Sequence, residues 1–182
     1  MAKDSRFRLV QSAAKLIGMR GISGTSFSDV LADSGAPRGS LYHHFPGGKN
    51  QMAIDAIALT SQQILSHQRA FPGGAPADVL AWFVEIFRHA VRTSGGKCGC
   101  AVAGVALDTD ERGALLEAAR TAFRTWTSVL AQQFEQSGLP LARAEALAVT
   151  ALAAMEGALI LCRAERDLAP LEAIAEQLGT LV

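Results

Sequence analysis

Two short apolar-patterned segments that meet at a glycine constrain the fold of this 182-residue chain more than any other feature. Ser26, with Asp29 three residues later, forms a weak variant of the capping box, which predicts a helix start at Phe27. Gly35 is a natural left-handed end for that helix, and Pro37 suits the first position of the next one. The stretch therefore predicts two helices joined by a tight turn.

The second of these helices is short and has two different faces. Pro-Gly-Gly at 46–48 breaks it after Phe45. The side chains expected to pack inward are Val30, Leu31, Ala36, Leu41 and Phe45. The side chains left outward are polar or absent, at Arg38, Gly39, Ser40, Tyr42, His43 and His44. A supporting helix, a turn and a short polar-faced helix make the pattern of a helix-turn-helix.

The outward groups have chemistry that suits the major groove of DNA. Arg38 can donate two hydrogen bonds to one guanine edge, and Gly39 lets the backbone approach a base closely. Hydroxyl, imidazole and ammonium groups nearby can donate to phosphate oxygens. Taken singly, a Tyr-His-His triplet is more often surface or core packing than a binding site, so the prediction depends on the joint spacing. The predicted DNA contacts are Thr25, Ser26, Arg38, Gly39, Ser40, Tyr42, His43, His44 and Lys49.

The charge distribution agrees with a polyanion partner at this end of the chain. The formal net charge is zero, yet residues 1–51 hold seven Lys or Arg against three Asp. The remaining residues hold ten basic and fourteen acidic side chains. The basic excess is therefore confined to the region of the helix-turn-helix.

The rest of the chain predicts further helices and no sheet. Ala and Leu are abundant and aromatic residues few, which favours packed helices. Helical spacing and Gly or Pro breaks predict helices at about 4–20, 49–69, 77–93, 111–137, 140–165 and 168–180, with a short apolar segment at 102–107. We therefore expect an all-α protein with a three-helix DNA-binding domain at 1–48 and a helical-bundle domain for ligand sensing and dimerisation at 49–182.

Aromatic and flexible apolar side chains in the second domain are candidates for a ligand pocket. Pockets between helices are common ligand sites, although aromatics at helical spacing also form plain core. The predicted ligand-binding residues are Trp82, Phe83, Phe87, Phe123, Trp126, Met155 and Leu159.

The segment 140–165 has little side-chain bulk and is apolar around much of its circumference. Such a helix is buried on several sides, either inside one chain or against a second copy. We expect it to form a two-fold dimer interface with the last helix. The predicted interface residues are Ala146, Val149, Ala153, Gly157, Leu161, Leu171 and Ile174.

Several other classes of protein are disfavoured. Cys98 and Cys100 lack a zinc-type spacing and have adjacent glycines, so we expect a tight loop, no metal and no cofactor. The P-loop, nucleophile-elbow, metalloprotease and dinucleotide-binding motifs are all missing, so no enzymatic activity is expected. The apolar stretch 146–162 is interrupted by Thr150 and Glu156, and the N-terminus has no signal-peptide pattern, so we expect a cytoplasmic protein without a membrane partner.

The chain resembles the TetR/AcrR family of bacterial transcription regulators. The resemblance lies in Gly21, Thr25-Ser26-Phe27, Val30-Leu31-Ala32, Ser34-Gly35-Ala36, Gly39 to Phe45 and Lys49. The phrases Gly35 to Ser40, Pro46 to Lys49 and Gly99 to Val102 are similar to the LmrA/YxaF-like subgroup. The sequence departs from the family pattern at Pro37, in the longer link before Lys49, and at Asn50.

This resemblance implies a three-helix DNA-binding domain, a larger helical ligand domain and a homodimer that represses transcription until an effector binds. The expected partners are a double-stranded DNA operator, a small hydrophobic or aromatic effector and a second copy of the chain. The alternative is a non-catalytic helical adaptor without sequence-specific DNA binding.

Overall fold

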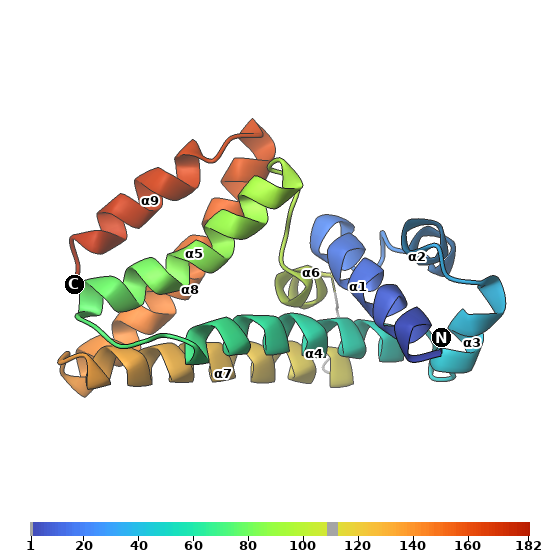
Figure 1. The fold of residues 1–182 in the computed structure, drawn as a ribbon, viewed down its shortest axis with the longest axis horizontal. Helices are drawn as coiled ribbons and strands as arrows, with labels where there is room; N and C mark the ends of the chain where they lie inside the picture. The colour runs from blue at the N-terminus through green and yellow to red at the C-terminus, as the bar shows by residue number, and fades with distance from the viewer. Residues whose placement is uncertain (1, 109–112) are drawn as a thin grey trace. The chain divides into compact units, whose positions relative to one another are not determined.

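A computed structural model of the chain describes residues 2–108 and 113–182, with the side chains of 2–4, 38 and 40 left out. This part of the chain is helical, without a strand, which confirms the all-α prediction (Figure 1). Its helices are α1 Ala2–Arg20, α2 Phe27–Ser34, α3 Arg38–His44, α4 Gly48–Arg69, α5 Pro76–Ser94, α6 Ala101–Leu107, α7 Ala114–Gln136, α8 Leu141–Glu165 and α9 Ala169–Gly179.

The helices belong to two compact units, which are described separately below. Unit 1 comprises residues 1–62 and 99–122, and unit 2 comprises 63–98 and 123–182. The division cuts α4 and α7 and places α6 with the N-terminal helices. The compact units thus divide the chain at points other than the boundary predicted at 48/49, which remains a prediction about functional modules.

In unit 1, α1 holds the helix-turn-helix through polar contacts. Ser12 Oγ donates to Asp33 Oδ2 at 2.8 Å, and Lys15 Nζ lies 2.5 Å from Asp33 Oδ1. Arg6 pairs with Asp55 of α4 at 2.8 Å. The core beneath these pairs includes the fully buried Leu9, Ile17, Val30, Leu41 and Met52. The polar contacts of Asp33 and Asp55, together with the apolar core beneath them, therefore hold α2 and α4 against α1.

Helix α1 also approaches α6 so closely that backbone meets backbone. A Cβ on Gly99 would lie 1.9 Å from the carbonyl oxygen of Gly18, and one on Gly104 would lie 2.4 Å from that of Ile17. At the end of α6, the Asp108 carboxylate accepts the Ser23 N–H at 2.5 Å. Because only glycine fits such an approach, these contacts explain why α6 belongs to unit 1.

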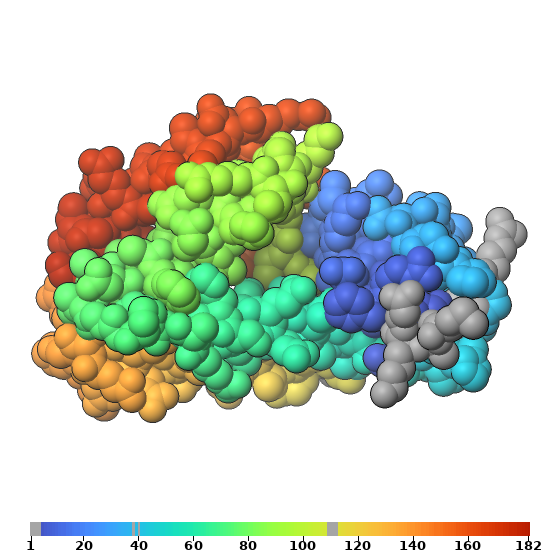
Figure 2. Space-filling view, viewed as in Figure 1, coloured from blue at the N-terminus to red at the C-terminus, as the bar shows by residue number. Residues whose placement is uncertain are grey.

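In unit 2, α5, α8 and α9 pack on one another, and α5 and α9 lie side by side on the face drawn in Figure 2. Their core contains Phe83, Phe87, Met155, Leu171 and other buried apolar side chains. Helix α8 is long and apolar enough to span a membrane by length and composition, and 44% of its apolar window is buried. A buried core helix of a protein that does not enter a membrane can have the same length and apolar composition.

Candidate nucleic-acid interface and ligand region

The start of α2 and the turn between α2 and α3 are built by the residues that the sequence singled out. Ser26 is the N-cap of α2: its Oγ accepts the Asp29 N–H at 3.1 Å, and Asp29 Oδ2 accepts the Ser26 N–H at 2.9 Å. Gly35 ends α2 in the left-handed region with φ 64°. Pro37 is the N-cap of α3, one position earlier than predicted, so Arg38 begins that helix.

One face of α3 is buried and the other is open. Leu41 and Phe45 are buried, as are Val30 and Ala36, which confirms the inward set apart from the half-buried Leu31. Tyr42 is 71% exposed, and its ring meets that of Phe27 edge-on at 6.0 Å. The Phe27 ring thereby supports Tyr42 on the surface and limits its rotamers.

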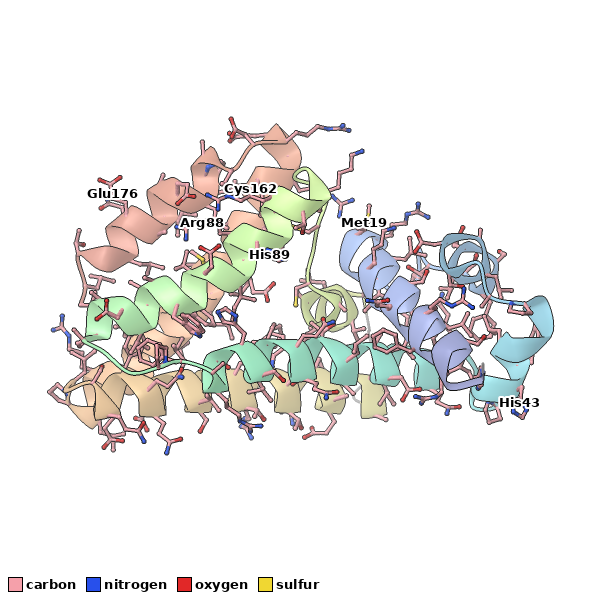
Figure 3. The ribbon with its side chains drawn as sticks, viewed as in Figure 1. Met19, His43, Arg88, His89, Cys162 and Glu176 are labelled. Carbon is pink, nitrogen blue, oxygen red and sulfur yellow. The ribbon has the colours of Figure 1, made fainter. Side chains whose placement is uncertain are left out.

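The histidines and the lysine continue this open face. His43, labelled in Figure 3, is exposed and His44 is half-buried, and their ring centroids lie 5.3 Å apart. Gly39 is exposed, and a Cβ there would meet nothing within 4 Å. Lys49 is half-buried in the first turn of α4. Hydroxyl, imidazole and ammonium donors therefore lie along one short helix and the start of the next.

The remaining predicted contacts are placed differently. Thr25 is buried, and its hydroxyl donates to the Gly21 carbonyl at 2.8 Å. This hydroxyl therefore stabilises the α1–α2 loop and does not lie on the open face of α3. Ser26 is exposed but uses its hydroxyl as the α2 cap. The side chains of Arg38 and Ser40 lie outside those the structure describes.

Two carboxylates of α2 have lowered pKa values, which favours their charged form. The hydrogen bonds from the Ser26 side chain and backbone lower the pKa of Asp29, with smaller effects from Arg20 and Lys49. The hydrogen bond from Lys15 lowers the pKa of Asp33, and Ser12 adds to it. Both carboxylates are thus engaged by neighbouring donors, from α1 for Asp33 and from the start of α2 for Asp29.

Comparisons with known proteins agree with this arrangement. Residues 9–56 match the family of bacterial regulatory proteins of the tetR type, and residues 76–177 match the C-terminal domain of LmrA/YxaF-like transcriptional regulators. A helix-turn-helix transcriptional regulator of Mycobacterium tuberculosis is 36% identical over 97% of this chain and 93% of its own length. The chain belongs to the TetR family. It is a DNA-binding transcription regulator of the LmrA/YxaF-like group, as the sequence resemblance indicated.

Two further relatives extend this result. The transcriptional regulator LmrA of Bacillus subtilis is 31% identical over 92% of this chain and 91% of its own length. The crystal structure of a TetR regulator from Chloroflexus aurantiacus superposes with a TM-score of 0.79 at 26% identity, covering 98% of this chain and 94% of that one. Proteins of this family are regulators and not enzymes, which confirms that expectation.

In this TetR-family chain, the predicted ligand residues are mostly core. Phe83, Phe87, Trp126, Met155 and Leu159 are buried, whereas Trp82 and Phe123 are half-buried. Phe83 and Phe87 meet edge-on at 5.2 Å, as do Phe123 and Trp126 at 5.4 Å. Their role in ligand binding remains a prediction.

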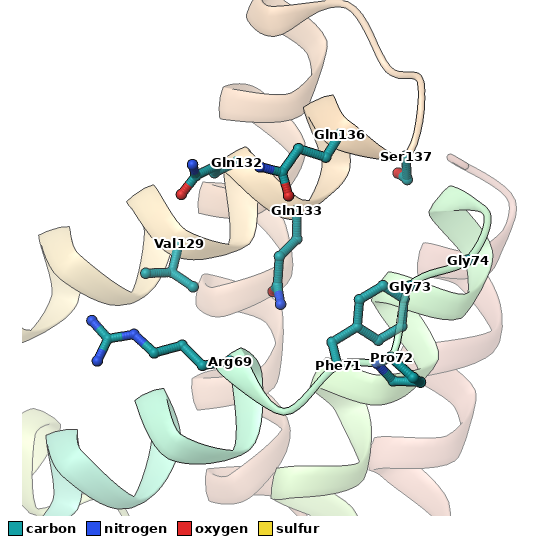
Figure 4. Close-up of a pocket in the computed structure, with 10 residues that line it drawn as sticks. All are labelled: Arg69, Phe71, Pro72, Gly73, Gly74, Val129, Gln132, Gln133, Gln136 and Ser137. Carbon is teal, nitrogen blue, oxygen red and sulfur yellow. The ribbon is translucent and has the colours of Figure 1, made fainter.

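The structure describes a groove at another place in unit 2, where the α4–α5 connection faces the end of α7 (Figure 4). Its volume is about 400 Å³. The lining residues are Arg69, Phe71, Pro72, Gly73, Gly74, Val129, Gln132, Gln133, Gln136 and Ser137. None of the predicted ligand residues lines this groove, because most of their side chains are enclosed in the core.

A buried polar side chain close to this groove was missed by the sequence reasoning. Gln68 is fully buried, its Nε2 donates to the Trp126 carbonyl at 3.3 Å, and its backbone carbonyl accepts from Gln133 Nε2 at 2.5 Å. A signal was present, because Gln68 follows Ile64 by four residues and so occupies an inner position of the helix.

The predicted dimer residues divide between surface and interior. Ala146, Val149, Ala153 and Leu161 of α8 are exposed, with half-buried Gly157 between them. On α9, Ile174 is half-buried, but Leu171 is fully buried and packs within the chain. Ile160, 64% exposed, extends the same apolar stripe and was not predicted.

None of the three cysteines, all of which lie among the described residues, forms a disulfide. Cys98 and Cys100 are half-buried, and burial raises the pKa of the Cys162 thiol. Within residues 2–108 and 113–182, no group of three or more His, Cys, Asp or Glu side chains could hold a metal ion.

Proposed function

We propose that this TetR-family regulator is a homodimeric, cytoplasmic repressor that leaves its operator when a small hydrophobic or aromatic effector binds in unit 2. The observation that carries the proposal is that two exposed surfaces of the chain differ in chemistry, one being polar and the other apolar. Donors are exposed on α3, whereas an apolar stripe is exposed on α8.

The α3 face supports operator reading. Its buried side includes Leu41 and Phe45, so the exposed side is presented rigidly, with Tyr42 supported by Phe27. The outward residues are Gly39, Tyr42, His43 and His44, a set suited to phosphates and base edges. We expect Arg38 and Ser40 to act with them from the same helix.

The α8 stripe supports the dimer. Ala146, Val149, Ala153 and Ile160 recur at helical spacing and are exposed, although an apolar row of this length is normally covered. The two alanines in this row let a second helix approach closely. Two copies joined in this way would present two reading helices to half-sites about one DNA turn apart.

The aromatic cluster of unit 2 supports a planar apolar effector. Trp82 stacks on His67 with ring centroids 4.6 Å apart, and Trp126 meets Phe123 edge-on. Rings in these arrangements are suitable walls for another aromatic ring. An effector releases the operator only if it binds one state of the dimer more tightly than the other.

The proposal is tested with purified protein and operator DNA, taken from upstream of the gene or selected from a random pool. Fluorescence anisotropy first measures operator binding, and a panel of aromatic compounds is then added at fixed protein concentration. Release by some compounds and sedimentation as a dimer support the proposal. Binding that no compound weakens, or a monomer at all micromolar concentrations, contradicts its effector part or its dimer part respectively.

A further inference from the structure

A carboxylate at the end of α6 binds the loop that leads into the helix-turn-helix. Asp108 is the C-cap of α6, and its Oδ2 accepts the backbone N–H of Ser23 at 2.5 Å. Ser23 lies in the α1–α2 loop, residues 21–26, and belongs to unit 1 together with Asp108. The two residues are 85 positions apart, so this hydrogen bond joins segments that are distant in the chain.

The same carboxylate lies directly against the first residue of the loop. Gly21 has a φ of 73°, in the left-handed region, and a Cβ there would lie 2.6 Å from Asp108 Oδ2. Glycine at this position therefore satisfies two requirements, the backbone angle and the space that the carboxylate occupies. The shape of the loop and the position of Asp108 thus depend on each other.

Hydrogen bonds inside the loop connect this contact to the start of α2. The Gly21 carbonyl accepts the Thr25 hydroxyl at 2.8 Å, and the Thr25 N–H donates to the Ile22 carbonyl at 3.2 Å. Thr25 is fully buried, and the next residue, Ser26, is the N-cap of α2. Asp108 therefore holds a loop whose last residue determines where α2 begins.

Helix α6 gives Asp108 a fixed position, because it packs closely on α1 (Figure 1). A Cβ on Gly104 would lie 2.4 Å from the Ile17 carbonyl oxygen, and Val105 on the same helix is fully buried. In contrast, Ser23 and Gly24 in the middle of the loop are exposed. Apolar burial does not hold this part of the loop, whereas the Asp108 carboxylate does.

We propose that Asp108 is a positioning residue for operator binding, because its carboxylate fixes the α1–α2 loop, and with it the start of α2, in the geometry that the operator requires. Without this hydrogen bond the loop has more conformations, and DNA binding must then order it at a cost in affinity. Contacts with phosphates alone depend less on this geometry, so the loss falls on the operator more than on unrelated DNA. This inference rests on the operator reading in the proposed function.

The charge of Asp108 distinguishes a positioning role from a general electrostatic effect. A carboxylate on the unit that binds DNA repels phosphates, so its removal should, by charge alone, strengthen binding to every duplex. The positioning role predicts the opposite sign for the operator. A weaker operator complex after the loss of a negative charge is therefore the expected signature.

Anisotropy titrations with two duplexes test the proposal: the operator, selected from random DNA, and a scrambled duplex of equal length and composition. In Asp108→Ala we expect operator affinity to fall at least about tenfold, because a charge-assisted hydrogen bond is lost, and affinity for the scrambled duplex to stay equal or rise. Asp108→Asn loses the same charge but keeps an oxygen that can accept the Ser23 N–H, so its operator affinity stays within about threefold of the wild type.

Two further variants serve as controls. Glu117→Ala removes an exposed carboxylate from the same unit, and Ser23→Ala removes an exposed side chain but keeps the backbone donor. Both should keep the wild-type ratio of operator affinity to scrambled-duplex affinity. Wild-type operator affinity in Asp108→Ala overturns the proposal, and so does an equal loss of affinity for both duplexes.

Hydrogen–deuterium exchange without DNA shows whether the effect is confined to the loop. In Asp108→Ala we expect the peptide that contains residues 21–25 to exchange at least about tenfold faster, while α1 and α6 exchange as in the wild type. Faster exchange throughout unit 1 makes Asp108 a residue of general stability and overturns the proposal. If the wild type binds both duplexes equally, the operator reading is contradicted, and the inference about Asp108 fails with it.

Discussion

Arg88 of α5, labelled in Figure 3, binds both carboxylate oxygens of Glu172 on α9: Nε lies 2.8 Å from Oε1, and Nη2 lies 2.8 Å from Oε2. Glu85 occupies the third edge of the same guanidinium, with Nη1 2.6 Å from its Oε2. Two-point pairing of this kind fixes orientation as well as distance. It therefore sets how α9 lies on α5 within unit 2.

The Arg88–Glu172 pair predicts a stability that depends on pH. The hydrogen bond from Arg88 lowers the pKa of Glu172, so its contribution is present above the unfolded-state value of about 4.3 and is lost as pH falls through the folded-state pKa. Because both side chains are partly exposed, we expect Glu172→Gln to cost about 1 kcal/mol at pH 7. Urea unfolding at pH 7 and pH 3 measures this cost, which should shrink at the lower pH.

Glu176→Gln is the matched control for that experiment, because Glu176 is exposed on the same helix. We expect it to leave the unfolding free energy nearly unchanged at both pH values. An equal loss for the two variants, or a loss for Glu172→Gln that is as large at pH 3, contradicts the role of the ion pair.

The backbone contact between α1 and α6 predicts that Gly99 tolerates no side chain. A Cβ there would lie 1.9 Å from the Gly18 carbonyl oxygen, so Gly99→Ala must push the two segments apart. We expect a loss of about 1–3 kcal/mol in unfolding free energy. Gly179→Ala, where a Cβ meets nothing within 4 Å, is the control and should be neutral. Equal stability of both variants contradicts the close contact.

The assignment of DNA contacts predicts two different effects of removing a positive charge. Lys49→Gln should weaken binding to all sequences and reduce the salt slope by about 1, because it deletes one phosphate contact. Arg38→Ala should cost about 1–3 kcal/mol and relax the preference at one base pair. Lys97→Gln, an exposed lysine of unit 2, controls for net charge. Anisotropy titrations at several salt concentrations distinguish the three variants, and identical behaviour would refute the assignment.

The α8 stripe predicts that one added charge separates the dimer without unfolding the chain. Val149 is 57% exposed in the single chain, so Val149→Glu leaves the helical content unchanged but places a charge in the proposed interface. We expect a monomer in sedimentation velocity at concentrations where the wild type is a dimer. Ala81→Glu, exposed on α5, should sediment as the wild type does. A dimeric Val149→Glu would place the interface elsewhere.

Local signals predicted much of unit 1. Ser26 with Asp29 and the glycine at Gly35 act through hydrogen bonds and backbone angles within a few residues, so the sequence alone showed where α2 begins and ends. Thr25 was predicted to contact a phosphate. The sequence does not show that the α1–α2 loop folds back on Gly21 and buries Thr25. Phe7 lies three residues before the buried Val10 on α1, yet it is 50% exposed, which helical spacing alone does not predict.

Contacts between distant segments could not be predicted in the same way. Gly18 and Gly99 are far apart in the chain, and no spacing pattern pairs them. The aromatic residues of unit 2 were recognised as a set, but helical spacing does not distinguish a side chain that fills a core from one that lines a groove. Gln68 shows the difference, because only the three-dimensional contacts reveal which atom of its amide has no partner.

The central claim is that the α3 face reads a specific DNA sequence, and the most direct measurement is a competition titration. Labelled operator, selected from random DNA, is bound by the wild-type protein at 150 mM salt and displaced by unlabelled operator or by a scrambled duplex of equal length and composition. We predict that the operator competes at least about 10³-fold better than the scrambled duplex. Equal competition by the two duplexes would contradict sequence-specific reading and favour a helical adaptor with only general affinity for polyanions.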